Sequence, residues 1–169
     1  MKTPKKTLAL ATALLAASAQ AQTCDPHILA TAPASRFTIN ASRGTALDKR
    51  TGLMWKRCAE GLSGAGCLTG ALAYYNWGGA LTAAAQSAQG GYQDWRLPNV
   101  KELASLVEQQ CYAPAINLTA FPNATSDAYW SSSRYASNSA FAWFVYFGDG
   151  DSFYDRFYSF AVRLVRGGQ

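Results

Sequence analysis

The chain has 169 residues and a formal net charge of +5, from 15 basic and 10 acidic residues. Three of the basic residues, Lys2, Lys5 and Lys6, lie in the first six positions, and without them the balance is 12 basic against 10 acidic residues. A net charge this small does not imply nucleic acid as a partner.

The first 21 residues predict a secretory signal peptide. Lysines precede the apolar run "TLALATALLAASA", and the small residues Ala19 and Ala21 place the cleavage after Ala21. This run is shorter than the roughly 20 residues that cross a bilayer, and no other stretch approaches that length. We therefore expect an exported protein without a membrane span, located in the periplasm, at the cell surface or outside the cell. About 148 residues remain, enough for one domain with a core.

Four cysteines remain after cleavage, and an even number in an exported chain predicts two disulfides. Cys58 and Cys67 are joined by the glycine-rich segment "AEGLSGAG", which favours the pairs Cys58–Cys67 and Cys24–Cys111. A zinc site is the alternative, but no cysteine pair has CxxC-type spacing and His27 is the only histidine. We expect no metal.

The segment after the signal peptide, residues 22–46, begins as a polar lead. Phe37 and Ile39 alternate with polar residues, residues 48–52 form a turn, and Leu53 and Trp55 resume the alternation. The pattern predicts two strands around one turn.

Two helices follow. Asn76 can cap an alanine-rich helix that Gly90 and Gly91 end. Asn99 can cap a second helix, with Glu102 completing a capping box. The second helix carries an apolar stripe typical of a core-facing helix, made of Val100, Leu103, Leu106 and Val107.

The C-terminal third predicts strands. A Pro- and Asn-rich loop over 111–127 precedes three strand-like pieces, "AYWSSSRY", "FAWFVYFGDG" and "FAVRLVR". Trp143, Val145 and Phe147 alternate in the second piece, and Val162 and Leu164 in the third. The order of elements predicts an α+β fold with an antiparallel sheet.

Several motifs of this chain stand in the order typical of one protein family: "TGLMWKRC", "GGYQDWRLPNVKELASLVE", "INLTAFPN", "YWSSS", "AWFVYFGDG" and "VRLVRGG". Over residues 47–168 the chain resembles the Lcl C-terminal domain family, which leaves 22–46 as a lead segment. The resemblance implies a C-type lectin-like or formylglycine-generating-enzyme-like fold, in which two helices pack on a small twisted sheet with long loops. Within that fold we expect Arg96 and Arg163 to bind buried carbonyls or carboxylates. We expect four core aromatics: Trp55, Trp95, Trp130 and Trp143.

The fold does not supply the function. The EPN-type and WND-type motifs of calcium-dependent lectins are absent, and "GDGDSFYD" lacks the glycine and terminal Glu of an EF-hand loop. Formylglycine-generating activity needs reactive cysteines, and a lone histidine offers no Ser-His-Asp set. We therefore expect neither an enzyme nor a cofactor.

Residues 129–160 hold 13 of the 22 aromatic residues, mixed with Ser, Asp, Ala, Asn and Gly. Rigid rings with small polar groups are typical of binding surfaces. Exposure is expected for five rings in particular, those of Tyr146, Phe153, Tyr154, Phe157 and Tyr158. The predicted site for an unidentified protein or glycan ligand comprises Tyr146, Asp149, Asp151, Phe153, Tyr154, Asp155, Phe157, Tyr158 and Phe160.

The resemblance extends to variable proteins of diversity-generating retroelements, in which Asn codons mutate to Tyr, Ser, Asp or Phe near the C-terminus. In the C-terminal region of this chain, positions occupied by Tyr, Ser, Asp or Phe alternate with positions that we interpret as fixed, among them Val145 and Phe147. Asn138 is the one Asn that remains there. A heavily mutated copy and an ordinary diverged paralogue both fit this pattern.

A second interpretation follows from the founding family member, which resembles a trimeric binder of sulfated glycosaminoglycans. It predicts a glycosaminoglycan-binding adhesin, with a homotrimer as an option although the chain has no collagen-like stalk. A structural envelope protein is a third alternative. The corresponding anionic-glycan patch comprises Arg43, Lys49, Arg50, Lys56 and Arg57.

Overall fold

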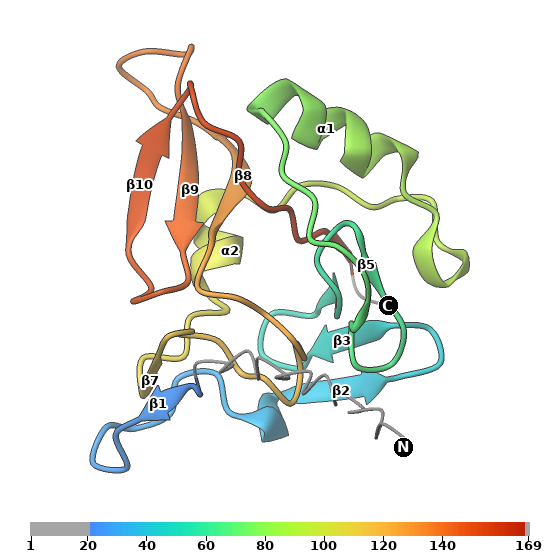
Figure 1. Cartoon of the computed structure of the whole chain (residues 1–169), viewed down its shortest axis with the longest axis vertical. Helices are drawn as coiled ribbons and strands as arrows, with labels where there is room; N and C mark the ends of the chain where they lie inside the picture. Colours follow the sequence, from blue (N-terminus) through green and yellow to red (C-terminus); the bar gives the residue numbers. More distant parts are fainter. Residues whose placement is uncertain (1–20, 168–169) are drawn as a thin grey trace, which may run out of the picture.

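A computed structural model describes residues 21–167, so the predicted signal peptide lies outside the described residues except for Ala21 (Figure 1). The described chain contains helices α1 (Trp77–Gln86) and α2 (Val100–Ala104), the short 3₁₀ helices η1 (Ala34–Arg36) and η2 (Gln89–Gly91), and four small sheets with antiparallel strand pairs. This is the predicted α+β class.

Within residues 21–167, no helix combines the length and the apolar character needed to cross a membrane.

The four-stranded sheet has the order β11-β4-β3-β2 and joins the two ends of the domain. Its strands are β2 (Phe37–Asn40), β3 (Thr45–Asp48), β4 (Leu53–Lys56) and β11 (Val165–Gly167). The predicted turn over residues 48–52 and the strand after it are present, but the chain before that turn forms two strands instead of one, because residues 41–44 form a second turn that ends at Gly44 with a φ of +66°. A left-handed φ of this kind suits glycine.

The three-stranded sheet has the order β10-β9-β8 and consists of β8 (Ala128–Arg134), β9 (Ala142–Tyr146) and β10 (Ser152–Asp155). The predicted strand over "FAVRLVR" was wrong for most of its length. Residues 161–164 are buried without alternation as the chain passes from one sheet to the other, and the strand begins at Val165. Isolated bridges from Ala161 to Tyr129 and from Val165 to Arg96 hold this crossing.

Both helices begin at the predicted caps. The Asn76 side chain accepts a hydrogen bond from the Gly79 N–H, and Asn99 and Glu102 form the predicted capping box. Helix α2 ends at Ala104, so the last two residues of the predicted apolar stripe, Leu106 and Val107, lie beyond the helix. Leu106 and Val107 are nevertheless buried, because the turn after the helix keeps them against the core.

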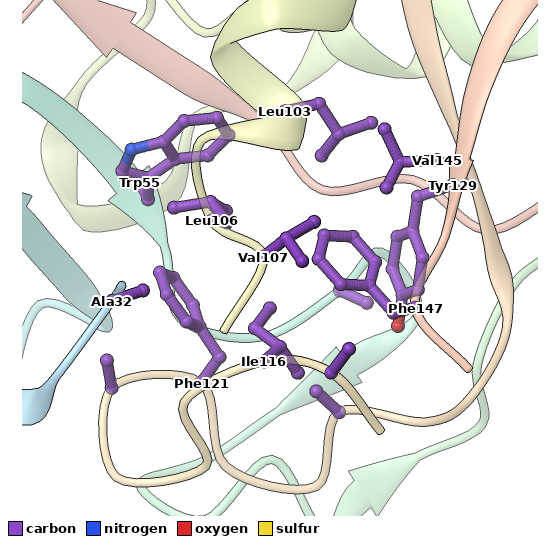
Figure 2. Packing of buried hydrophobic residues seen from close by; sticks show 14 of the residues in the cluster. Ala32, Trp55, Leu103, Leu106, Val107, Ile116, Phe121, Tyr129, Val145 and Phe147 are labelled. Carbon is purple, nitrogen blue, oxygen red and sulfur yellow. The ribbon is translucent and has the colours of Figure 1, made fainter. Parts of the chain in front are cut away.

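Two core clusters surround the three-stranded sheet. One contains Trp55 with residues of α2, β8 and β9 (Figure 2), and the other contains Trp95 and Trp130 with alanines of α1. The predicted burial of these three tryptophans is confirmed. The prediction that Trp143 is a core residue was wrong, because its ring is half-buried among other rings at the sheet surface.

The predicted role of Arg163 is confirmed, whereas Arg96 binds a carboxylate that is only half-buried. Arg163 is buried and donates from Nη1 to the carbonyl oxygens of Lys56 and Arg57. Arg96 donates two hydrogen bonds of 2.8 Å to the carboxylate of Glu102, which also closes the capping box.

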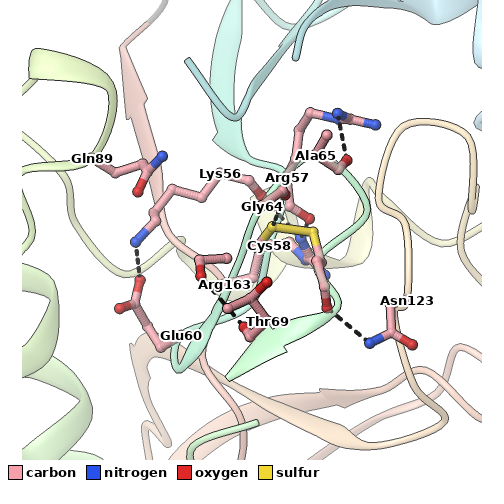
Figure 3. The surroundings of a disulfide bond; sticks show 12 residues. Lys56, Arg57, Cys58, Glu60, Gly64, Ala65, Thr69, Gln89, Asn123 and Arg163 are labelled. Atoms are coloured by element: carbon pink, nitrogen blue, oxygen red, sulfur yellow. Dashed lines mark hydrogen bonds and ion pairs between the residues drawn. A yellow bond between two sulfur atoms is a disulfide. The ribbon is translucent and has the colours of Figure 1, made fainter. Parts of the chain in front are cut away.

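Both predicted disulfides are present. Cys24–Cys111 links β1 (Thr23–Cys24) to β7 (Cys111–Tyr112). Cys58–Cys67 closes the loop that carries β5 (Leu62–Ser63), and β6 (Thr69–Gly70) follows directly (Figure 3). The lead segment is therefore held on the domain by a disulfide as well as by the strand pairing of β2.

Candidate ligand-binding site

The candidate site is built on the β9–β10 hairpin. Tyr146 N–H donates to the Asp151 carbonyl, and Gly150, with a φ of +95°, closes the turn by donating to the Tyr146 carbonyl. The register places Phe153 opposite Phe144 on one face of the hairpin, and Tyr154 opposite Trp143 on the other. Aromatic rings therefore project from both faces.

The first ring cluster comprises Tyr135, Phe141, Trp143, Tyr154 and Phe157. Tyr135 and Tyr154 stack with their centroids 4.0 Å apart, and Trp143 contacts the Tyr154 ring edge-on at 5.5 Å. The Tyr135 hydroxyl, as a hydrogen-bond partner and a nearby ionisable group, raises the pKa of the Tyr154 phenol above its ordinary value.

Arg156 extends the first ring cluster. Its guanidinium lies 4.4 Å from the ring centroid of Phe157 and 5.4 Å from that of Phe141. Both distances fall within the range of cation–π attraction, which positions the two rings although they lie in loops.

The second ring cluster comprises Phe144, Phe153, Tyr158 and Phe160. The Phe144 and Phe160 rings pack at 4.4 Å and rest on the buried Trp130. Phe153 contacts Phe144 at 5.8 Å, and Tyr158 lies 6.3 Å from Phe160. The cluster thus continues from the core to the surface.

The rings predicted to be exposed are exposed. Tyr146, Phe153, Tyr154, Phe157 and Tyr158, called below the five exposed rings, have exposed fractions between 37% and 72%. Phe160, also a predicted site residue, is half-buried beneath them.

The three predicted acidic residues lie at the ends of β10. Asp149 accepts a hydrogen bond from the Asp151 N–H, and Asp155 accepts from the N–H groups of Phe157 and Tyr158. These two carboxylates therefore shape the turns that carry the rings. Within residues 21–167, no group of three or more His, Cys, Asp or Glu side chains is placed to hold a metal ion.

A shallow hollow of about 250 Å³ lies beside the first ring cluster. Trp143 and Ser152 line it from the sheet, and Val100, Lys101 and Ala104 from α2. Because most of this lining is apolar, the hollow can receive one apolar side chain or the apolar face of a ring.

The structure does not bring the five residues of the predicted anionic-glycan patch together on the surface. Arg43, Lys49 and Arg50 are exposed, whereas Lys56 and Arg57 are buried. Lys56 forms an ion pair with Glu60 at 2.5 Å, and Arg57 donates to the carbonyl of Ala65 (Figure 3). Arg57 also donates to the carbonyls of Thr119 and Ala120.

Sequence reasoning missed Tyr135, Phe141 and Arg156 as members of the site, and assigned Trp143 to the core. Tyr135 and Phe141 flank the connection between β8 and β9, where the Tyr135 N–H donates to the Phe141 carbonyl. The signal that could have found them is the pairing of β8 with β9, which brings both ends of that connection to the same end of the sheet.

Comparison with known proteins gives one result. No curated protein and no solved structure matches the chain. The family model of the Lcl C-terminal domain matches residues 44–166, which is most of the sequence and includes both ring clusters. The chain therefore belongs to the Lcl C-terminal domain family.

Proposed function

We propose that this protein is an exported, non-enzymatic binding module of the adhesin or receptor type. Its binding surface consists of the two ring clusters, which lie on opposite faces of the β9–β10 hairpin, and the acidic residues at the ends of β10, and its ligand is a protein or a glycan. The observation that carries the proposal is the exposure of five aromatic rings on the β9–β10 hairpin and the loop that follows it, while Val145 and Phe147 anchor the hairpin in the core.

The energetics favour binding at this surface. Tyr and Phe side chains lose little conformational entropy when they contact a ligand, and each contributes a large contact area. The hairpin beneath them is held by Val145 and Phe147, which are fully buried. A ligand therefore meets rings that are largely positioned before it arrives.

Two further features support an exported binding role. All four cysteines are held in disulfides, which is typical of exported proteins. The same bonds leave no thiol for the cysteine chemistry of the formylglycine-generating enzymes.

We extend the proposal to the C-type lectin-like arrangement and to diversification by a retroelement. Support comes from the distribution of residues: the mixed positions Phe153, Tyr154 and Phe157 are exposed, whereas the fixed positions Val162 and Leu164 are buried. A near-copy of the 3′ end of the gene, differing at adenines and adjacent to a reverse transcriptase gene, is the genomic observation that tests diversification.

The binding proposal is tested by selecting ligands on wild-type protein from a random peptide library and a glycan array, then measuring their affinity for two variants. The double variant Phe157→Ser/Tyr158→Ser should lose at least tenfold in affinity, since buried aromatic contacts dominate binding energies. The control Leu29→Ser/Tyr112→Ser removes two exposed apolar side chains from the region of β1 and β7 and should bind as wild type does. Ligands that bind both variants equally well contradict the proposal.

A further inference from the structure

Strand β10 has an open edge. It is the outer strand of the β10-β9-β8 sheet, and at the left of Figure 1 it lies at the margin of the molecule. Ser152, Phe153 and Tyr154 are exposed. An open edge presents unpaired main-chain groups to any chain that can adopt an extended conformation.

The register identifies which main-chain groups are free. Because Tyr146 N–H donates to the Asp151 carbonyl, alternation in an antiparallel pair directs the main-chain groups of Phe153 and Asp155 toward β9. Those of Ser152 and Tyr154 therefore point outward, away from β9 and toward the open edge of the sheet. Their spacing, about 6.8 Å, is twice the rise of a strand and matches alternate residues of an added strand.

The side chains beside this edge are apolar on both faces of the sheet. Phe153 and Phe144 line one face. Tyr154 and the hollow beside Trp143 line the other. A strand added at the edge would therefore place its central side chains against aromatic or apolar surface on both faces.

Charge argues against a second copy of this chain as the occupant. Outward groups must meet outward groups, so the antiparallel register that centres on Phe153 places Asp151 of each copy opposite Asp155 of the other. Both carboxylates share the face of Phe153, and like charges directly opposite each other are destabilising. The same two carboxylates would attract basic residues four positions apart in a different chain.

We propose that the β10 edge binds an extended segment of another polypeptide, which adds antiparallel to β10 as a fourth strand. The segment carries Lys or Arg opposite Asp151 and Asp155 and apolar residues between them. This proposal rests on the binding function proposed above and names the ligand class. The main-chain groups provide affinity, and the alternating side chains select the sequence.

The test uses synthetic pentapeptides with acetylated and amidated ends. Lys-Val-Phe-Val-Lys should bind wild-type protein roughly five- to tenfold more tightly than Glu-Val-Phe-Val-Glu, because two cross-strand pairs change from attraction to repulsion. Asp151→Lys should weaken the first peptide and strengthen the second. Asp25→Asn, which removes an exposed charge outside the binding surface and keeps the oxygen that accepts from the His27 N–H, should change the preference little.

Main-chain pairing is tested with two N-methylated isomers of the Lys-flanked peptide. Methyl groups on the amides of residues 2 and 4, which lie opposite Tyr154 and Ser152, should reduce affinity at least tenfold. Methyl groups on residues 3 and 5 point away from β10 and should be tolerated. In the bound protein, hydrogen exchange should slow at the amides of Ser152 and Tyr154.

Two results overturn this inference: equal affinity of the N-methylated isomers, or no binding of the Lys-flanked peptide. Neither result affects the wider binding proposal if selected ligands still require Phe157 and Tyr158. The wider proposal fails when those ligands bind the ring variant as they bind wild type. The two failures are therefore separate observations.

Discussion

At the scale of single residues, Trp130 and Trp143 differ in burial, although both were predicted from the sequence to be core residues. Trp130 is fully buried and donates from Nε1 to the Tyr75 carbonyl at 2.7 Å. Trp143, thirteen positions later, is half-buried under Tyr135 and Tyr154. A half-buried ring loses less contact area when it is truncated, so the two positions should contribute differently to stability.

We predict that Trp130→Ala lowers the free energy of unfolding by about 3–5 kcal/mol, as large-to-small core substitutions do. Trp143→Ala should cost about half as much, and Tyr158→Ala should stay within about 0.5 kcal/mol because its ring is exposed. Urea denaturation of the three variants checks this order. Equal losses at Trp130 and Tyr158 would show that the second ring cluster is core rather than surface.

At the scale of elements, the turn between β9 and β10 depends on Gly150. Its φ of +95° is unfavourable for other residues, and a Cβ there would lie 2.4 Å from Cγ1 of Val107. Val107 is itself buried, so it cannot move away freely. The hairpin can therefore pack on the core only because residue 150 is a glycine and has no side chain.

We predict that Gly150→Ala destabilises the protein by about 1–3 kcal/mol, the range for a residue held in a strained backbone conformation. It should also loosen β10, which hydrogen exchange at Phe153 and Asp155 would detect. The control is Gly52→Ala, where φ is +70° but nothing lies within 4 Å of the added Cβ. A smaller loss for Gly150→Ala than for Gly52→Ala would mean that the turn does not contact Val107.

At the scale of the whole molecule, the Cys24–Cys111 disulfide attaches the lead segment to the domain. The Glu108 carboxylate reinforces this attachment by accepting hydrogen bonds from the N–H groups of Thr31 and Ala32. This disulfide closes a loop with a sequence separation of 87, compared with 9 for Cys58–Cys67. Longer loops lose more entropy on cross-linking.

We predict that Cys24→Ser/Cys111→Ser lowers the free energy of unfolding by about 4–5 kcal/mol, and Cys58→Ser/Cys67→Ser by about 2–3 kcal/mol, on chain-entropy reasoning. Thermal and urea denaturation of the two double variants gives the comparison. The reverse order would indicate that local packing around Cys58–Cys67 outweighs loop closure.

The sequence by itself determined the features that depend on neighbouring residues or on composition. The helix caps at Asn76 and Asn99, the Cys58–Cys67 loop, the α+β class and the concentration of rings near the C-terminus all follow from local chemistry. The exposure of rings such as Phe153 and Tyr154 was predictable as well, because acidic residues and Arg156 interrupt them and a buried strand does not tolerate unpaired charge.

Only the tertiary structure decided which distant residues meet. Arg57 belongs to a basic run in the sequence, which suggests an exposed side chain. In the structure its guanidinium is buried and donates hydrogen bonds to the carbonyls of Thr119 and Ala120. Strand β10 has no strand-like pattern of its own, and it forms because β9 supplies its hydrogen-bond partners. Both outcomes have one physical cause: main-chain and side-chain polar groups need hydrogen-bond partners, and such a partner can come from a part of the chain that local sequence does not identify.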